Sequence, residues 1–242
     1  MTAFLGVLYL LVFLAAGCTC VRFLLPRKSL LTRVWLGVSL GLLLMMWLPA
    51  LIAFAADFTW TAHLLALIPL AGLTAGCFFL RDPSQVKKWD AREKQLAGQM
   101  LMVVLPLTLL SGYLQYTHCL RVGNDGGWWV GQSTYGDLPM HMSFITSLKN
   151  AAFPPDSLST SLYLMGFSLE WAIVVPGTLM MALCFTGVMV LAREMTAGKK
   201  TIILATLLFF LNGGLGFLYN FDLAGGTLNN PFSTVIERIR EI

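Results

Sequence analysis

Long apolar runs separated by short polar stretches make up most of this 242-residue chain. Each run reaches about 20 residues, the length at which an α-helix crosses a hydrocarbon core of about 30 Å. We therefore predict six membrane-spanning helices, at residues 3–25, 34–56, 60–80, 100–120, 172–192 and 201–219. No basic residue precedes the first run, and the run is longer than the apolar part of a secretory signal. We expect it to be retained as a span.

Basic residues are distributed unevenly between alternate loops, and this predicts the orientation of the spans. The loops after the first, third and fifth spans carry four, five and three of them, which is twelve of the 16 in the chain. Because cytoplasmic loops are enriched in Lys and Arg, we expect these loops in the cytoplasm and the N-terminus outside the plasma (inner) membrane. His63, His118 and His141 then fall at or beyond the outer ends of spans, as do seven of the 12 acidic residues.

Composition narrows the class of protein further. The chain is 57% hydrophobic and only 12% charged, whereas soluble domains are roughly 45–50% apolar and about 25% charged. These values exclude a soluble globular domain, a disordered chain and a fibrous repeat. The five cysteines are interpreted as small hydrophobic residues, because four lie in apolar runs and Cys18-Thr19-Cys20 lacks the spacing of a redox or zinc pair. No basic patch is interleaved with exposed aromatic residues, so we expect no nucleic-acid partner.

The longest polar stretch holds most of the candidate chemistry. It covers about forty residues between the fourth and fifth predicted spans, on the outer side. Asn124-Asp125-Gly126 is a strong turn signal, and Trp128, Trp129 and Tyr135 are typical of the aromatic belt at a membrane surface. This part of the loop should therefore lie at the level of the lipid headgroups.

Two short helices are predicted in the second half of this loop. The first covers residues 138–150, with Asp137 as its N-cap and with Leu138, Met142, Ile145 and Leu148 on one apolar face. It is too short to span a membrane, so we expect it to lie along the outer surface. A second amphipathic segment, 158–167, leads into the fifth span. The predicted fold is all-α and integral to the membrane, with about six transmembrane helices and an outer loop that carries interfacial amphipathic helices.

Asp137 and His141 are one helical turn apart and form the candidate catalytic pair. A carboxylate at a helix N-terminus is held ionised by the helix dipole and by backbone N–H groups, which suits a base or a cation ligand. His141 can share the proton or orient a phosphate. The alternative is an ordinary N-cap beside a histidine that reaches toward water. Glu170, at the start of the fifth span, is either a functional acid or an interfacial one that reaches water.

The sixth predicted span contains a second unusual segment. Its Gly213-Gly214 pair should kink or break the helix, which lipid tolerates only beside protein or a water-filled cavity. Close helix packing and a substrate cavity are both consistent with it.

The outer loop resembles the first outer loop of polytopic membrane glycosyltransferases of the GT-C type. The similar residues are 131–148, GQSTYGDLPMHMSFITSL, followed by the segment NAAFPP at 150–155. More closely, the chain resembles a set of large bacterial membrane proteins with a GDLPxH loop and a later NGGLGF segment, here 212–217. The resemblance covers about residues 99–242, so we divide the chain into a three-span region, 1–98, and a GT-C-like region, 99–242.

The resemblance implies a function and a role for several residues. Asp137 would be the base that activates the acceptor hydroxyl, and the donor would be a sugar on a polyprenyl phosphate, presented from the membrane lipid. Glycosyl transfer also needs a group that neutralises the departing phosphate, and the candidates are His141, Arg121 or Lys149. Tyr135 and Glu170 complete the substrate-binding candidates. A divalent cation is left open, because many members carry two adjacent acids where Asp137 stands alone. Since members usually have more spans, we expect this chain to be the N-terminal part of a longer protein.

A different class of function also fits the pattern. The chain would then be a non-enzymatic polytopic membrane protein, either an assembly subunit or part of a transporter, with the glycine-broken sixth span and Glu170 lining a path. No inverted repeat relates the two halves, which argues against a transporter. The basic loop at 81–94 is a further candidate for binding anionic lipid or a cytoplasmic partner, although it equally fits the positive-inside signal.

Overall fold

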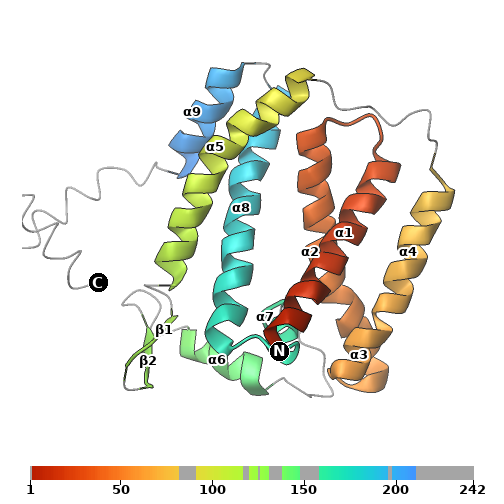
Figure 1. Cartoon of the computed structure of the whole chain (residues 1–242), viewed down its shortest axis with the longest axis vertical. Helices are drawn as coiled ribbons and strands as arrows, with labels where there is room; N and C mark the ends of the chain where they lie inside the picture. The colour runs from red at the N-terminus through yellow and green to blue at the C-terminus, as the bar shows by residue number, and fades with distance from the viewer. Residues whose placement is uncertain are drawn as a thin grey trace, which may run out of the picture. The chain divides into compact units, whose positions relative to one another are not determined.

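The computed structural model describes residues 2–81, 91–116, 120–124, 126–130, 138–147, 158–195 and 198–210. The described chain is almost wholly helical (Figure 1). Its helices are α1 (Thr2–Leu24), α2 (Leu30–Ala56), α3 (Trp60–Leu65), α4 (Leu67–Phe79), α5 (Ala91–Leu114), α6 (Leu138–Ser147), α7 (Leu158–Leu164), α8 (Leu169–Met195) and α9 (Lys199–Phe210). The chain divides near the end of α8 into two compact units, Met1–Val190 and Leu191–Ile242.

Five segments of the described chain are long and apolar enough to cross a membrane. They are Ala3–Leu24, Leu30–Ala56, Trp60–Phe79, Glu93–Leu114 and Leu169–Met195. These helices correspond to the first five predicted spans and indicate an integral membrane protein. The predicted sixth span begins within α9, and its second half, from residue 211, lies outside the described residues together with Gly213 and Gly214.

Helices α1 and α2 pack through glycines at backbone-to-backbone distance. A Cβ atom on Gly41 would lie 2.6 Å from the Phe13 carbonyl oxygen, and one on Gly37 would lie 2.6 Å from the Cys18 Cα. A Cβ on Gly17 would collide with the backbone of both of these α2 glycines. Small residues are the usual means by which helices approach closely in lipid, where no hydrophobic effect drives them together. The first two spans therefore form a tightly joined pair.

A buried core gathers around the end of this pair where α3 and α7 lie (Figure 1). The side chains of Phe13, Met45, Phe58 and Leu162 are all at most 1% exposed there. Leu162 comes from α7, so part of the long connection between α5 and α8 packs into the N-terminal helices rather than remaining at the surface. At that point α1 also approaches the loop closely, because a Cβ on Gly6 would lie 2.5 Å from the Phe167 ring.

The predicted continuous helix over 60–80 is wrong in one respect, because it is interrupted at Ala66. Helix α3 ends at Leu65 and α4 begins at Leu67. Pro69 explains the break: it has no N–H to donate to the Leu65 carbonyl, and its ring would clash with that group in a continuous helix. The two helices still form a single candidate span.

The predicted end of the fourth span, at residue 120, is also wrong. Helix α5 ends at Leu114. Leu120 instead begins strand β1 (Leu120–Val122), which pairs antiparallel with β2 (Trp128–Val130) in the register Leu120↔Val130. Counting apolar residues could not distinguish a helix from a strand here, because β-branched and aromatic residues favour a strand when a tight turn joins two such segments. The turn lies where Asn124-Asp125-Gly126 predicted one, with Gly126 at φ 76°.

One polar contact joins α2 to α8 across the interior of the first unit. The Trp35 indole Nε1 donates a hydrogen bond of 2.9 Å to the Leu183 carbonyl oxygen, 148 residues away. Gly187, one turn further along α8, makes room for this indole, since a Cβ there would lie 3.1 Å from the Trp35 ring. An indole N–H inside a span needs a partner, so this contact fixes α8 against the N-terminal pair.

Candidate functional site

Three of the six predicted site residues lie within the described chain. These are Arg121 in β1, His141 in α6 and Glu170 in the first turn of α8. Asp137, Tyr135 and Lys149 lie outside the described residues. The site is therefore built from the elements that flank Asp137, namely the β1–β2 hairpin before it and helix α6 immediately after it.

Helix α6 has the amphipathic character that the sequence predicts. Leu138 and Ile145, which are seven positions apart and share one face, are buried, whereas His141 is exposed. The side-chain hydroxyls of Ser143 and Thr146 each donate to a carbonyl oxygen of α6 itself, over 2.9 Å. The exposed side of α6 thus leaves the His141 imidazole accessible.

Glu170 is held by its neighbours at the start of α8. The Ser168 hydroxyl donates to the Glu170 carboxylate over 2.5 Å, and the Ser168 carbonyl accepts the first helical N–H, from Ala172, over 2.9 Å. A carboxylate in the first turn is stabilised by the positive end of the helix dipole. Glu170 is partly exposed, and its carboxyl oxygens can accept hydrogen bonds from a bound group.

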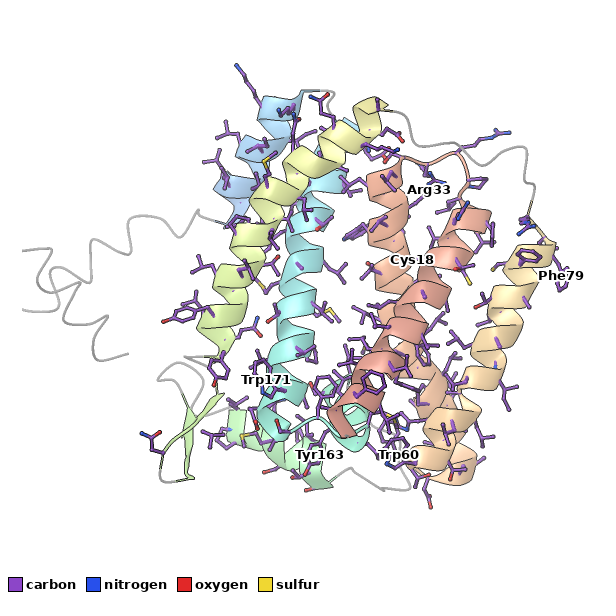
Figure 2. The ribbon with its side chains drawn as sticks, viewed as in Figure 1. Cys18, Arg33, Trp60, Phe79, Tyr163 and Trp171 are labelled. Carbon is purple, nitrogen blue, oxygen red and sulfur yellow. The ribbon has the colours of Figure 1, made fainter. Side chains whose placement is uncertain are left out.

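An aromatic pair lies beside Glu170. Trp171 stacks on Tyr116 with ring centroids 5.4 Å apart and planes 20° from parallel. Trp171 is 45% exposed, and Figure 2 shows it near the end of α8 at which Tyr163 and Trp60 also lie. Stacked aromatic surfaces beside acidic and hydroxyl groups are a common setting for sugar rings, and the same residues also suit the interface of a membrane.

A buried polar group around His63 was not predicted. His63 is fully buried, and its Nδ1 lies 2.8 Å from the Thr59 carbonyl oxygen. This contact places the ring proton on Nδ1, so Nε2 accepts from the Ser161 hydroxyl, 3.1 Å away on α7. The Tyr9 hydroxyl donates to the His63 carbonyl over 3.3 Å. Residues from α1, α3 and α7 thus meet in a single hydrogen-bonded group, which we call the His63 cluster.

The His63 cluster is arranged for packing rather than for chemistry on a substrate. Ser161 is 1% exposed, and the His63 ring is covered by Phe58, whose ring centroid lies 4.7 Å away. A serine nucleophile needs room for a carbonyl carbon beside its oxygen and for the donors that stabilise the intermediate. His63 lies near the first end of the Trp60–Phe79 span, where the sequence places it, and its side chain is buried in the interior.

No signal in the sequence pairs His63 with Ser161. The two residues are 98 positions apart, and each occurs in a short amphipathic segment whose other polar residues are equally plausible partners. A hint was present in residues 158–164, where hydroxyl side chains stand among leucines, since polar groups inside an apolar segment need partners when buried. The partner itself depends on how α7 folds back against α1 and α3.

A second group of polar side chains lies between α5 and α8. The hydroxyls of Thr108 and Thr178 are buried and have no hydrogen-bond partner within the described part of the chain. Gly112 faces Thr178, and Gly177 leaves room for the amide of Gln115, with which a Cβ would collide. Polar side chains at this depth in a span are costly and are often functional.

No family model, no curated protein and no solved structure matches this chain. Among the described residues, no three His, Cys, Asp or Glu side chains come together as they would to hold a metal ion. The candidate site is consequently defined by the chain's own residues: the hairpin, the exposed face of α6 and the start of α8.

Proposed function

We propose that the protein is a membrane glycosyltransferase-like enzyme that transfers a sugar from a polyprenyl-phosphate donor to an acceptor hydroxyl at the outer leaflet. The observation that carries the proposal is the connection between α5 and α8. It links two candidate spans and contains a hairpin and two short helices, α6 and α7. This order matches the loop plan of the GT-C enzymes that the sequence resembles, in which the catalytic acid precedes the first short helix.

In the proposed reaction Asp137 is the general base. It takes the proton from the acceptor hydroxyl as that oxygen bonds to the anomeric carbon of the sugar. The bond between this carbon and the phosphate oxygen breaks, and polyprenyl phosphate leaves with the electron pair. General-base catalysis of this kind contributes about 10²–10⁴-fold to a rate. The place of Asp137 in the sequence, directly before α6, supports its assignment as the base, because N–H groups at a helix N-terminus keep such a carboxylate ionised.

Basic side chains on the same connection would stabilise the departing phosphate. His141 is exposed on α6, one turn from the start of the helix, and Arg121 lies in β1. Lys149 follows α6 in the sequence. On this scheme Tyr135 and Glu170 would bind the sugar, the latter beside the Tyr116–Trp171 stack. Charge that develops on a leaving group is stabilised most by donors that are already in place.

The proposed topology has six spans, with the N-terminus and the α5–α8 connection outside. The basic loops before α2, before α5 and after α8 support this orientation through the positive-inside rule. The donor's lipid tail would then lie in the outer leaflet beside α6, whose exposed Met140 and Phe144 suit an interfacial helix.

The test is sugar transfer in membranes that contain the protein in its natural length. Asp137→Asn should lower transfer from a labelled polyprenyl-phosphate sugar by at least about 100-fold. Asp156→Asn is the matched control, because it removes an acid from the same connection and should leave transfer unchanged. Undiminished transfer by the Asp137→Asn protein would exclude Asp137 from the mechanism.

The polar group between α5 and α8 favours a second candidate function, a non-enzymatic membrane protein that moves a solute or assembles with other subunits. The buried hydroxyls of Thr108 and Thr178 would line a path or meet a partner helix. Sealed vesicles distinguish the two functions, because a transporter moves a solute without altering it, whereas the enzyme changes both donor and acceptor.

A further inference from the structure

A groove of about 720 Å³ runs along the outside of the first unit, between α1 and α4. Small side chains such as Ala15, Ala71 and Ala75 line it. Its two hydroxyls, those of Thr19 and Thr74, donate to the carbonyls of Ala15 and Leu70 on their own helices, each over 2.8 Å. With their hydroxyls satisfied, these threonines add no free donor, and the groove is apolar.

The length of the groove matches one leaflet of a bilayer. Its lining on α4 extends from Leu67 to Phe79, which is about 18 Å at 1.5 Å per residue. Half of a hydrocarbon core of about 30 Å is about 15 Å. A hollow of this length on the lipid-facing side of two spans suits a single extended acyl chain.

A fixed cation stands at one end of the groove. The Arg81 guanidinium carbon lies 3.4 Å from the centre of the Phe78 ring and 5.3 Å from that of Phe23. Stacking on rings leaves the N–H edges of a guanidinium free, and these edges match the oxygens of a phosphate. Arg22, in the last turn of α1, is exposed near the same end, three residues beyond Thr19. Figure 2 shows Phe79, which also lines the groove, at this end of α4.

We propose that the groove between α1 and α4 binds an anionic phospholipid, with one acyl chain along the groove and the phosphate hydrogen-bonded to Arg81. The apolar groove and its cationic end together fit a molecule that has a hydrocarbon chain and an acidic head. A helix from a second copy of this chain fits less well, because it would have to bring an acceptor to Arg81. The cationic end of the groove lies at the end of α4 away from α3, and the proposal does not rest on the proposed sugar transfer.

Native mass spectrometry of the purified chain tests this site with two lipids of equal acyl chains, phosphatidylglycerol and phosphatidylcholine. Both headgroups contain a phosphate, but the choline cation of phosphatidylcholine offsets that charge and is repelled by Arg81. The unaltered chain should therefore retain one phosphatidylglycerol with about tenfold preference. Arg81→Gln should abolish that preference, and Arg81→Lys should keep most of it. Arg22→Gln removes the second basic residue near this end of the groove and should lower the preference by about two- to threefold.

Filling the groove provides the second part of the test. Ala71→Leu should lower retention of both lipids, whereas Gly72→Leu, at a position with open space around it, should behave as the unaltered chain. Equal retention of the two lipids, or a preference that survives Arg81→Gln, would overturn the proposal. So would displacement of the lipid by inorganic phosphate alone, or a dimer that Ala71→Leu converts to a monomer, which would assign the groove to a second copy.

Discussion

The Nε2 atom of His63 lies 3.1 Å from the hydroxyl oxygen of Ser161, although the two residues are 98 positions apart. This contact joins α3, which follows the turn between the second and third predicted spans, to α7, in the long connection that carries the candidate site. Both groups are buried, and Tyr9 of α1 bonds to the backbone of the same histidine. The His63 cluster therefore couples the position of the connection to the N-terminal helices.

Ser161→Ala should destabilise the protein through this cluster. The substitution leaves the His63 Nε2 acceptor buried without its partner, which costs about 1–3 kcal/mol. Reversible unfolding in mixed detergent micelles measures the change. Ser143→Ala is the control, because it removes an exposed hydroxyl whose bond stays within α6; it should alter the unfolding free energy by less than about 0.5 kcal/mol. Equal effects of the two variants would show that the cluster contributes nothing particular.

Gly41→Leu should separate α1 from α2. Its side chain would have to occupy the space of the Phe13 carbonyl and the Leu14 backbone, and overpacking against backbone costs about 3 kcal/mol. Size-exclusion chromatography and the unfolding midpoint report the loss. Gly72→Leu introduces the same side chain into α4 where nothing lies within 4 Å. A stable, monodisperse Gly41→Leu protein would contradict the close approach of these helices.

Trp35→Phe should loosen the attachment of α8. The phenyl ring keeps much of the packing against Gly187, but the bond to the Leu183 carbonyl is lost, with a cost of about 1 kcal/mol. The unfolding free energy checks this change. Trp47→Phe, at a tryptophan that is 49% exposed, is the matched control and should be nearly neutral. A larger loss at position 47 than at position 35 would argue against the contact.

His141→Gln should affect the proposed reaction without affecting the fold. The side chain is exposed, so its replacement should leave the unfolding free energy unchanged within about 0.5 kcal/mol. Loss of one imidazole hydrogen-bond donor near the departing phosphate should lower sugar transfer by about tenfold. Initial rates at saturating donor measure the effect, with His118→Gln as the control. Full activity of the His141→Gln protein would remove this histidine from the site.

The positions of the spans could be predicted closely, because a run of apolar residues is a property of the local sequence. The ends were less accurate. Helix α5 begins at Ala91, nine residues before the predicted start, because residues 91–99 include good helix formers that continue the helix beyond the apolar window. The break at Ala66 lies where Pro69 removes a hydrogen bond, but Pro49, Pro106 and Pro176 lie inside unbroken helices, so a proline alone does not predict a break.

Contacts between distant segments could not be predicted. The Trp35–Leu183 bond and the His63–Ser161 bond both depend on which faces of the helices meet, and many faces were equally apolar. The candidate site likewise has features that the sequence predicts and contacts that it does not. The sequence predicts α6 and its exposed histidine through helical periodicity, and Glu170 at the start of α8 through its place beside an apolar run. It does not predict that Ser168 holds Glu170 or that Tyr116 stacks on Trp171.

The proposed reaction requires α6 to face the outside of the cell, and chemical labelling measures this directly. A single cysteine would replace Met140, which is 49% exposed on α6, in a chain whose five native cysteines are changed to alanine. A second variant would carry its cysteine at Lys199, which is exposed at the start of α9 in a loop predicted to be cytoplasmic. With a membrane-impermeant maleimide on intact cells, position 140 should react at once and position 199 only after permeabilisation. Reaction at position 199 alone would place α6 inside and contradict the proposed function.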